Sequence, residues 1–207
     1  MWKAHPDPDY VDAIYLSHRP ADHYFGLPSV LLRFAEDERS KPLTILCPDG
    51  MKSVIIEMID YGYLGALPKM NYEIKFKEVT EGKILFNDAE LSFAASSHPV
   101  KNYAIAVMEN GRKYAYSGDG NFNARTRELY RDCSLLVHES YAFGFDAHGH
   151  AEITAVIAMA SEQNVKLLAL THIQRDVRKN RMLEIQEMIR KSDLDVIIPE
   201  PGDVLDV

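Results

Sequence analysis

Residues 16–28 read LSHRPADHYFGLP and contain three side chains that bind divalent metals, His18, Asp22 and His23. They follow the apolar and β-branched run 11–16, which is typical of a strand. The loop after a strand can shape a cavity while the strand itself is held rigidly, so ligands placed there can converge on one point. The stretch therefore predicts a metal-binding loop at a strand end, and the helical spacing of apolar residues in 26–36 predicts a helix just behind it.

Side chains of the same kinds recur along the chain, mostly after apolar runs. They are His98 in SSHPV, Asp119 in SGDG, His138 and Glu139 in VHES, His148 and His150 in HGH, and His172 in LTHI. Imidazole and carboxylate together suit zinc, iron or manganese. We therefore expect several strand ends to contribute to one metal centre.

Composition narrows the class of protein. With 207 residues and 46% hydrophobic content, and without a break in composition, the chain is expected to form one domain over residues 1–207. A net charge of −8 argues against broad nucleic-acid binding. Cys47 and Cys133 lack CxxC spacing and predict buried thiols in a reducing compartment. We find no signal-peptide pattern and no apolar stretch of roughly 18 residues, so we expect a cytoplasmic protein without a membrane span.

The apolar pattern predicts an α/β fold. A strand over 43–47 and an amphipathic helix over 51–61 come first. From 72 to 116 the strand-like runs 72–76, 83–86, 89–95, 103–108 and 113–116 are interrupted at Asn87-Asp88 and Asn110-Gly111, which predicts an antiparallel meander. From 134 onward strands over 135–138, 167–170 and 196–198 alternate with helices over 152–163 and 178–191, which places helices on the outside of a sheet.

The order of these motifs resembles the metallo-β-lactamase superfamily, and within it the branch of ribonuclease Z and related phosphodiesterases. The family pattern HxHxDH followed by GLP is matched by His18, Asp22, His23 and residues 26–28. The branch's HE and GH motifs are matched by His138-Glu139 and Gly149-His150. The resemblance implies a four-layer αββα sandwich with a metal centre along the edge where its two sheets meet, and with shortened N-terminal strands in this chain.

The resemblance also implies metal ligands. His18, His98 and the bridging Asp119 would form one site, and Asp22, His23, Asp119 and His172 would form the second, with zinc as the expected metal and iron or manganese as alternatives. Asp22 would additionally accept a proton from the attacking water, or serve only as a ligand.

Three further roles are expected, and the first of them comes from the resemblance. His150 would contact the substrate phosphate or protonate the leaving group, or else simply enter a helix. His138 and Glu139 would hold the outer N–H groups of ligand imidazoles, or form a core pair at a strand end. Asn121 would donate to substrate oxygens, or only form a turn.

This chain departs from the family pattern in three places. Pro20 stands where the family has its second histidine, so one ligand of the first site is missing and activity is expected to be weaker. Few residues precede His18, so either the start of the chain is truncated or the first sheet is trimmed. A sheet without its outer strands would expose an unpaired edge, and its cover by a second subunit predicts a homo-oligomer. Only about twenty residues separate His98 from Asp119. They leave no room for the transfer-RNA-binding arm often inserted there, which argues against a transfer RNA substrate.

The sequence thus favours a metal-dependent hydrolase, a phosphodiesterase that uses metal-activated water on a small or nucleotide-like ester. One alternative is a metal-depleted, non-catalytic binding member of the fold, which Pro20 favours. Another is a lactone or thioester hydrolase, because the same centre can attack a carbonyl group.

Overall fold

The computed structural model describes residues 5–205 and divides into two compact units, Met1–Thr80 and Glu81–Val207. Each unit has its own sheet and its own hydrophobic core. The predicted single domain over residues 1–207 stays a prediction. Within residues 5–205 every helix is too short or too polar to cross a lipid bilayer.

The first unit is built on a three-stranded sheet in the order β1-β2-β3, with both strand pairs parallel. Its strands are β1 (Ala13–Tyr15), β2 (Leu43–Pro48) and β3 (Ile74–Val79), its α-helices are α1 (Leu27–Glu36) and α2 (Lys52–Gly62), and its 3-10 helices are η1 (Pro8–Tyr10), η2 (Ala21–His23) and η3 (Leu67–Lys69). The helices predicted over 26–36 and 51–61 and the strand predicted over 43–47 are confirmed.

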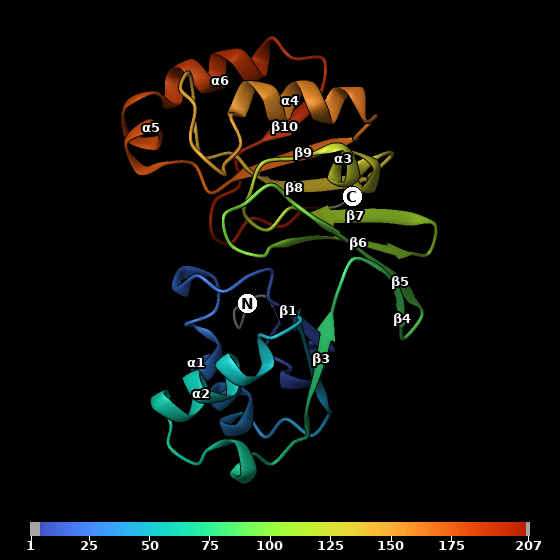
Figure 1. Cartoon of the computed structure of the whole chain (residues 1–207), viewed down its shortest axis with the longest axis vertical. Helices are drawn as coiled ribbons and strands as arrows, with labels where there is room; N and C mark the ends of the chain where they lie inside the picture. Colours follow the sequence, from blue (N-terminus) through green and yellow to red (C-terminus); the bar gives the residue numbers. More distant parts are fainter. Residues whose placement is uncertain (1–4, 206–207) are drawn as a thin grey trace. The chain divides into compact units, whose positions relative to one another are not determined.

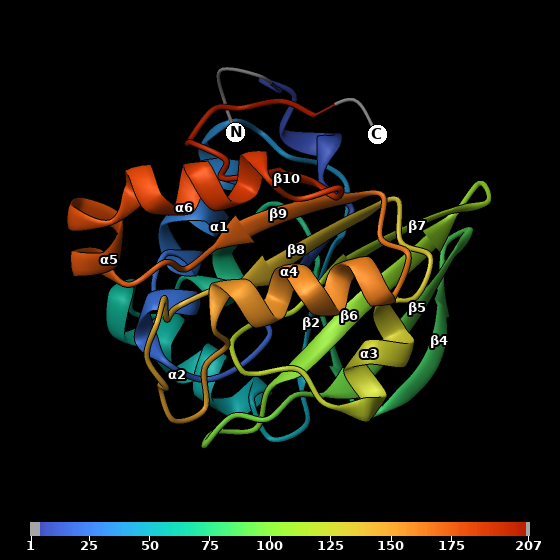
Figure 2. The same ribbon diagram turned by 90° about the horizontal axis from the view of Figure 1, so that it is seen from above.

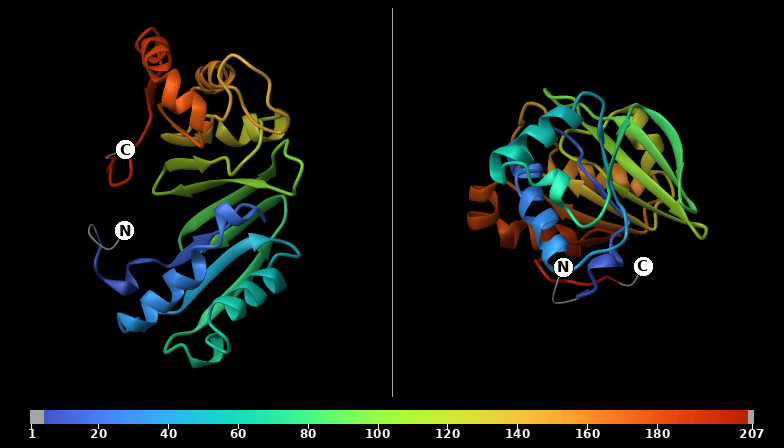
Figure 3. Two further views of the ribbon diagram at one scale, coloured as in Figure 1. Left: turned by 90° about the vertical axis from the view of Figure 1, so that its left-hand side faces the viewer. Right: turned by 90° about the horizontal axis from the view of Figure 1, so that it is seen from below.

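Both helices of this unit pack through one apolar face. Leu31 and Phe34 of α1, and Ile55 and Ile59 of α2, are buried at helical spacing. They share one core with alternate residues of β2, which are Leu43, Ile45 and Cys47. Figure 3 shows α1 and α2 alongside this sheet. The packing fixes β2, and β2 in turn pairs with β1, the strand that leads into residues 16–28.

The second unit is built on a seven-stranded sheet in the order β10-β9-β8-β7-β6-β5-β4 (Figure 1). Its strands are β4 (Gly82–Phe86), β5 (Ala89–Ala95), β6 (Tyr103–Glu109), β7 (Arg112–Tyr116), β8 (Leu135–Glu139), β9 (Leu167–Thr171) and β10 (Asp195–Ile197). Its helices are α3 (Ala124–Tyr130), α4 (Ile153–Glu162), α5 (Arg175–Asn180) and α6 (Met182–Arg190).

The predicted meander is correct only for β4 to β7. Its turns lie where expected, with positive φ at Asn87 (51°), Asn110 (50°) and Gly111 (75°). The assignment of 72–76 to the same meander was wrong, because β3 pairs in parallel with β2 in the other sheet. Alternation along a strand reports which face is buried but does not identify the neighbouring strand.

Strand direction decides where the functional side chains gather. The pairs β5–β6 and β6–β7 are antiparallel, whereas β7–β8 and β8–β9 are parallel. Strands β5, β7, β8 and β9 therefore all run in the same direction. Their carboxyl ends lie along one edge of the sheet, the position where α/β proteins place their sites.

Helices cover one face of the C-terminal strands, as alternation predicts. α4 and α6 lie over the same face of β8 and β9, and their buried residues share one core with those strands (Figure 2). The helix predicted over 178–191 is confirmed for α6 but not for its first residues, because Arg181, with φ −126° and ψ 12°, separates α5 from α6. The helix α3 was not predicted. It begins at the capping box of Asn123 and Thr126, which the Glu-based capping pattern does not describe.

Candidate metal centre

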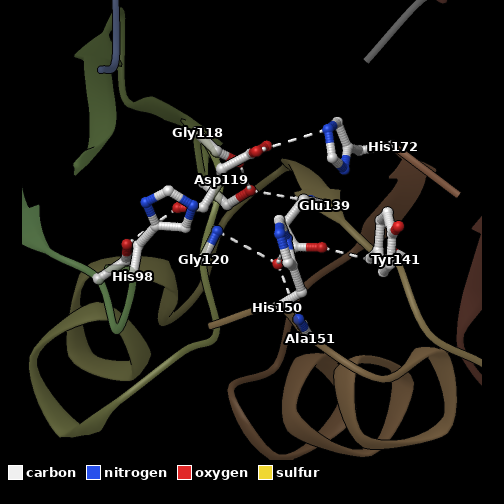
Figure 4. Close-up of polar contacts among 12 residues, drawn as sticks. His98, Gly118, Asp119, Gly120, Glu139, Tyr141, His150, Ala151 and His172 are labelled. Atoms are coloured by element: carbon white, nitrogen blue, oxygen red, sulfur yellow. Dashed lines mark hydrogen bonds and ion pairs between the residues drawn. The ribbon is translucent and has the colours of Figure 1, made fainter. Parts of the chain in front are cut away.

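Four polar residues lie at the carboxyl edge of the seven-stranded sheet. His98 lies in the loop after β5, Asp119 follows β7, Glu139 ends β8 and His172 comes directly after β9. Figure 4 shows them around one space together with His150, from the loop that leads into α4. The convergence expected from the sequence is thus present within Glu81–Val207 for His98, Asp119 and His172.

The backbone around Asp119 is held rigidly. Its N–H donates to Oδ1 of Asn102 (3.2 Å), and its carbonyl accepts from the Asn102 amide and from Oγ of Ser96 (2.9 Å). A Cβ atom on Gly120, which has φ of 108°, would lie 2.5 Å from Ser96 Oγ and 2.9 Å from His98 Cβ. Glycine is therefore required there, because it lets the loops after β5 and β7 approach closely.

The donor atoms in this cluster suit a divalent cation. His98, Asp119 and His150 each offer one nitrogen or oxygen within 4.8 Å of the others, and the same holds for Glu139, His150 and His172. Nε2 of His172 lies 3.4 Å from Oδ2 of Asp119. Imidazole nitrogens and carboxylate oxygens at this spacing are the donors used by zinc, iron and manganese. The side chains present therefore fit the metal that the sequence pattern implies.

Glu139 connects the cluster to the protein interior. Its carboxylate accepts N–H bonds from Gly120 (3.2 Å), Tyr141 (3.0 Å) and Ala151 (2.7 Å), and Oε1 lies 3.4 Å from Nδ1 of His150. Burial raises the pKa of Glu139 to about 7, opposed by the N–H groups of Ala151 and Tyr141 and assisted by the nearby charge of Asp119. The carboxylate thus joins the loop after β7 to the loop between β8 and α4, and it faces an imidazole.

His172 has an uncommon backbone conformation. Its φ is 54°, in the left-handed region that costs about 1–2 kcal/mol for most L-residues. Such outliers gather at functional sites, where the surrounding structure imposes them. The conformation occurs at the residue whose imidazole faces Asp119.

The predicted ligands of the first unit lie together within that unit. His18 follows β1, is fully buried, and its Nδ1 lies 3.0 Å from Oγ of Ser17. The rings of His18 and His23 have centroids 4.1 Å apart, and Nε2 of His23 lies 3.2 Å from Oδ2 of Asp22. Pro20 is the N-cap of η2, which contains Asp22 and His23. The six-residue ligand set stays a prediction.

The remaining predicted residues lie in different surroundings. The His138 ring is fully buried and packs against Tyr130 (5.5 Å) and Phe122 (6.2 Å). Oδ1 of Asn121 is buried and accepts no hydrogen bond from the described part of the chain. His148 is exposed. The roles of His138 and Asn121 stay predictions.

The buried imidazole of His138 predicts a pH dependence of stability. Burial lowers its pKa from 6.5 to about 4. The unfolded chain therefore binds more protons than the native protein between these values, and stability falls by about 3 kcal/mol as pH drops from about 6.5 to 4. His138→Leu should remove this part of the loss. The check is urea unfolding of the metal-free protein at several pH values; parallel pH curves for the two proteins would contradict the expectation.

Sequence reasoning missed two residues of the cluster. Asn102 bonds both sides of the Asp119 backbone, and Tyr141 packs its ring against His150 and His172. The only available signal for either was its closeness in sequence to a recognised motif, SSHPV for Asn102 and HES for Tyr141.

Fold and donor set together define an α/β protein with a metal-binding cluster at a sheet edge. The sequence model of the beta-lactamase superfamily domain matches residues 2–173. The chain belongs to the beta-lactamase superfamily, and it has the metallo-β-lactamase fold. This confirms the family recognised in the sequence and its fold class.

Individual relatives agree with this assignment. Ribonuclease Z of Nanoarchaeum equitans (strain Kin4-M) is 24% identical over 238 residues, covering 90% of this chain and 74% of its own. The structure of human tRNase Z, short form, has a TM-score of 0.74 at 19% identity, covering 97% of this chain and 80% of its own. A diphosphatase from the PhnP family has a TM-score of 0.70 at 18% identity, covering 95% and 71%. The relatives are hydrolases, which supports hydrolase activity and divalent-metal binding in this family.

Proposed function

We propose that this protein is a metal-dependent phosphodiesterase that acts on a small or nucleotide-like ester. The observation that carries the proposal is the gathering of imidazole and carboxylate donors at one edge of the seven-stranded sheet. These donors come from loops after β5, β7 and β9 and from the loop before α4, so the fold itself brings them together.

His98, Asp119 and His172 would hold the cation within Glu81–Val207. A divalent cation there would supply Lewis acidity, which lowers the pKa of water and stabilises charge on a phosphoryl oxygen. We expect zinc, with iron or manganese as alternatives. The family pattern adds His18, Asp22 and His23 as ligands. Single variants of these residues, compared by metal content, test their contribution.

His150 is the proposed proton donor to the leaving group. Its Nδ1 lies 3.4 Å from the Glu139 carboxylate, which favours a proton on that nitrogen and stabilises the imidazolium. Nε2 of His150 would then donate its proton to the leaving oxygen. Asp22 is the proposed acceptor of the proton from the attacking water, and Asn121 is proposed to donate to substrate oxygens. Glu139 would act through His150, as an orienting group.

A small substrate is favoured by the short connection between His98 and Asp119. This connection consists of β6, β7 and the turn at Asn110-Gly111, with only loop residues beside them. This connection contains no extended arm that could bind a transfer RNA. Relatives named ribonuclease Z and a PhnP-family diphosphatase support chemistry at phosphorus.

A substrate panel tests the proposal. The purified chain, loaded separately with zinc, iron or manganese, would be assayed on bis(p-nitrophenyl) phosphate, cyclic and linear dinucleotides, a dinucleoside diphosphate, a lactone and a thioester. We expect phosphodiester hydrolysis to have the highest kcat/KM. Faster lactone or thioester hydrolysis would favour the carbonyl alternative, and loss of all activity despite bound metal would overturn the proposal.

Pro20 favours the second candidate, a non-catalytic member with a depleted metal site. Its ring fixes φ at −56°, a value that histidine also adopts, so Pro20→His should be accommodated at the start of η2. We expect Pro20→His to raise bound metal per chain and to increase kcat, because it restores the missing imidazole of the family pattern. Pro20→Ala is the matched control. Equal metal content in all three proteins would show that this loop does not follow the family pattern.

The homo-oligomer and the cytoplasmic location stay predictions. Size-exclusion chromatography with light scattering would determine the oligomeric state.

A further inference from the structure

Three aromatic rings are grouped in the candidate centre. Tyr141 follows β8, and its ring centroid lies 4.7 Å from that of His150 at an interplanar angle of 26°. It lies 5.8 Å from that of His172 at 37°, and the two imidazoles are 5.6 Å apart at 15°. Figure 4 shows Tyr141 beside His150, on the side away from His98. One phenol ring therefore contacts two imidazoles from different loops.

Contacts of different kinds reach the His150 ring. The Glu139 carboxylate approaches it at Nδ1 (3.4 Å), the His98 ring meets it edge-on with centroids 5.5 Å apart, and Tyr141 stacks on its face. The His150 N–H bond to Ala147 (2.9 Å) and the Ala151 N–H bond to Glu139 fix the backbone of this loop but not the imidazole plane. A stacked aromatic face restrains that plane directly.

Tyr141 itself is held firmly. Its N–H donates to Oε2 of Glu139 (3.0 Å), and its carbonyl accepts from the N–H of Gln174 (3.1 Å), two residues beyond His172. Its hydroxyl makes no hydrogen bond within residues 5–205, whereas its ring makes both stacking contacts. Tyr141 thus contacts the two histidines through its ring and not through its hydroxyl.

We propose that Tyr141 is a positioning residue, whose ring fixes the planes of the His150 and His172 imidazoles. The inference rests on the proposed function, since it assigns Tyr141 to the same reaction. Positioning matters because a proton donor displaced by a fraction of an ångström transfers its proton less efficiently. The ring, and not the hydroxyl, is the part that acts.

The experiment compares Tyr141→Phe, which keeps the ring, with Tyr141→Leu and Tyr141→Met, which remove it. Loss of the stacking face should lower kcat about tenfold in the Leu and Met variants. KM should stay within about twofold, because substrate contacts are not removed. Tyr141→Phe should keep kcat within about twofold of the wild type. A purely structural role would instead lower the fraction of folded protein and leave kcat per folded molecule unchanged.

A second measurement does not depend on activity. In aromatic NMR spectra of the metal-free full chain, the ring of Tyr141 should shift the ring protons of His150 and His172 upfield, and Tyr141→Phe should retain these shifts. Tyr141→Leu should abolish them without changing the backbone spectrum beyond neighbouring residues. Thermal unfolding of each variant would verify that it is folded.

The outcomes separate the two claims. If the wild type hydrolyses no substrate, the proposed function fails, while the ring-current shifts still test the positioning. If the wild type is active and Tyr141→Leu matches it in kcat, the positioning fails alone. Equal losses in Tyr141→Phe and Tyr141→Leu would also overturn the inference, because they would assign the effect to the hydroxyl.

Discussion

Asp119→Ala is expected to abolish hydrolysis, lowering kcat/KM by at least about a hundredfold, and to strip metal from the protein. The Asp119 carboxylate is nearly buried and faces Nε2 of His172 at 3.4 Å. In the ligand set that we propose, Asp119 would bridge two metal sites. Removing this carboxylate should therefore lower the metal content per chain more than removing any single imidazole ligand does.

The fold should survive this change. The loop is held through the backbone N–H and carbonyl of Asp119, which bond to Asn102 and Ser96 and are unaffected by the substitution. We expect the unfolding free energy of the metal-free protein to change by no more than about 1 kcal/mol. Elemental analysis, hydrolysis assays and urea unfolding provide the measurements, with Asp119→Asn as the isosteric control. Full activity with retained metal in Asp119→Ala would refute the ligand assignment.

His172→Asn is expected to lower metal content and to reduce hydrolysis by at least about a hundredfold, with little loss of stability. Asparagine tolerates the left-handed backbone that His172 adopts at φ 54°. It lacks the imidazole that faces Asp119. The variant therefore separates ligand chemistry from backbone strain.

His172→Val is the matched control at the same position. It also removes the imidazole, but a β-branched residue is a poor fit to positive φ, so it should be less stable than His172→Asn by about 1–2 kcal/mol. Urea unfolding of the metal-free variants checks this difference. Wild-type metal content in His172→Asn would remove His172 from the ligand set, and equal stability of the two variants would contradict the strain argument.

Local signals carried most of the fold prediction. Asn110-Gly111 identified its hairpin because the turn needs positive φ at both residues, and the structure has it there. Leu31 and Phe34 identified α1 through their spacing on one buried face. Signals of this kind reside in a few neighbouring residues, so a single sequence reveals them.

Structural features that depend on residues far apart in the sequence could not be predicted from local patterns. The run 74–79 has strand character, but its parallel pairing with β2 depends on a strand about thirty residues earlier. The break between α5 and α6 falls at Arg181, whose guanidinium donates to the carbonyl of Phe143 and pairs with Glu184. Nothing in the helical periodicity of 178–191 indicates that contact.

In the candidate site, too, local sequence signals were predictable and contacts between distant residues were not. His98, Asp119 and His172 were predictable because ligand-type residues follow apolar runs, and strand direction then places them at one sheet edge. Tyr141 was not predictable, because an aromatic residue after a buried strand is usually a core residue. Its contacts with two imidazoles exist only in the folded chain.

Metal content per chain tests the central claim most directly. The full chain would be purified without chelator, dialysed against metal-free buffer after exposure to zinc, iron or manganese, and analysed for elements together with protein concentration. We predict at least one tightly held divalent cation per chain in the wild type and a clear loss in both Asp119→Ala and His172→Asn. A folded wild-type chain that retains none of the three metals would contradict the account.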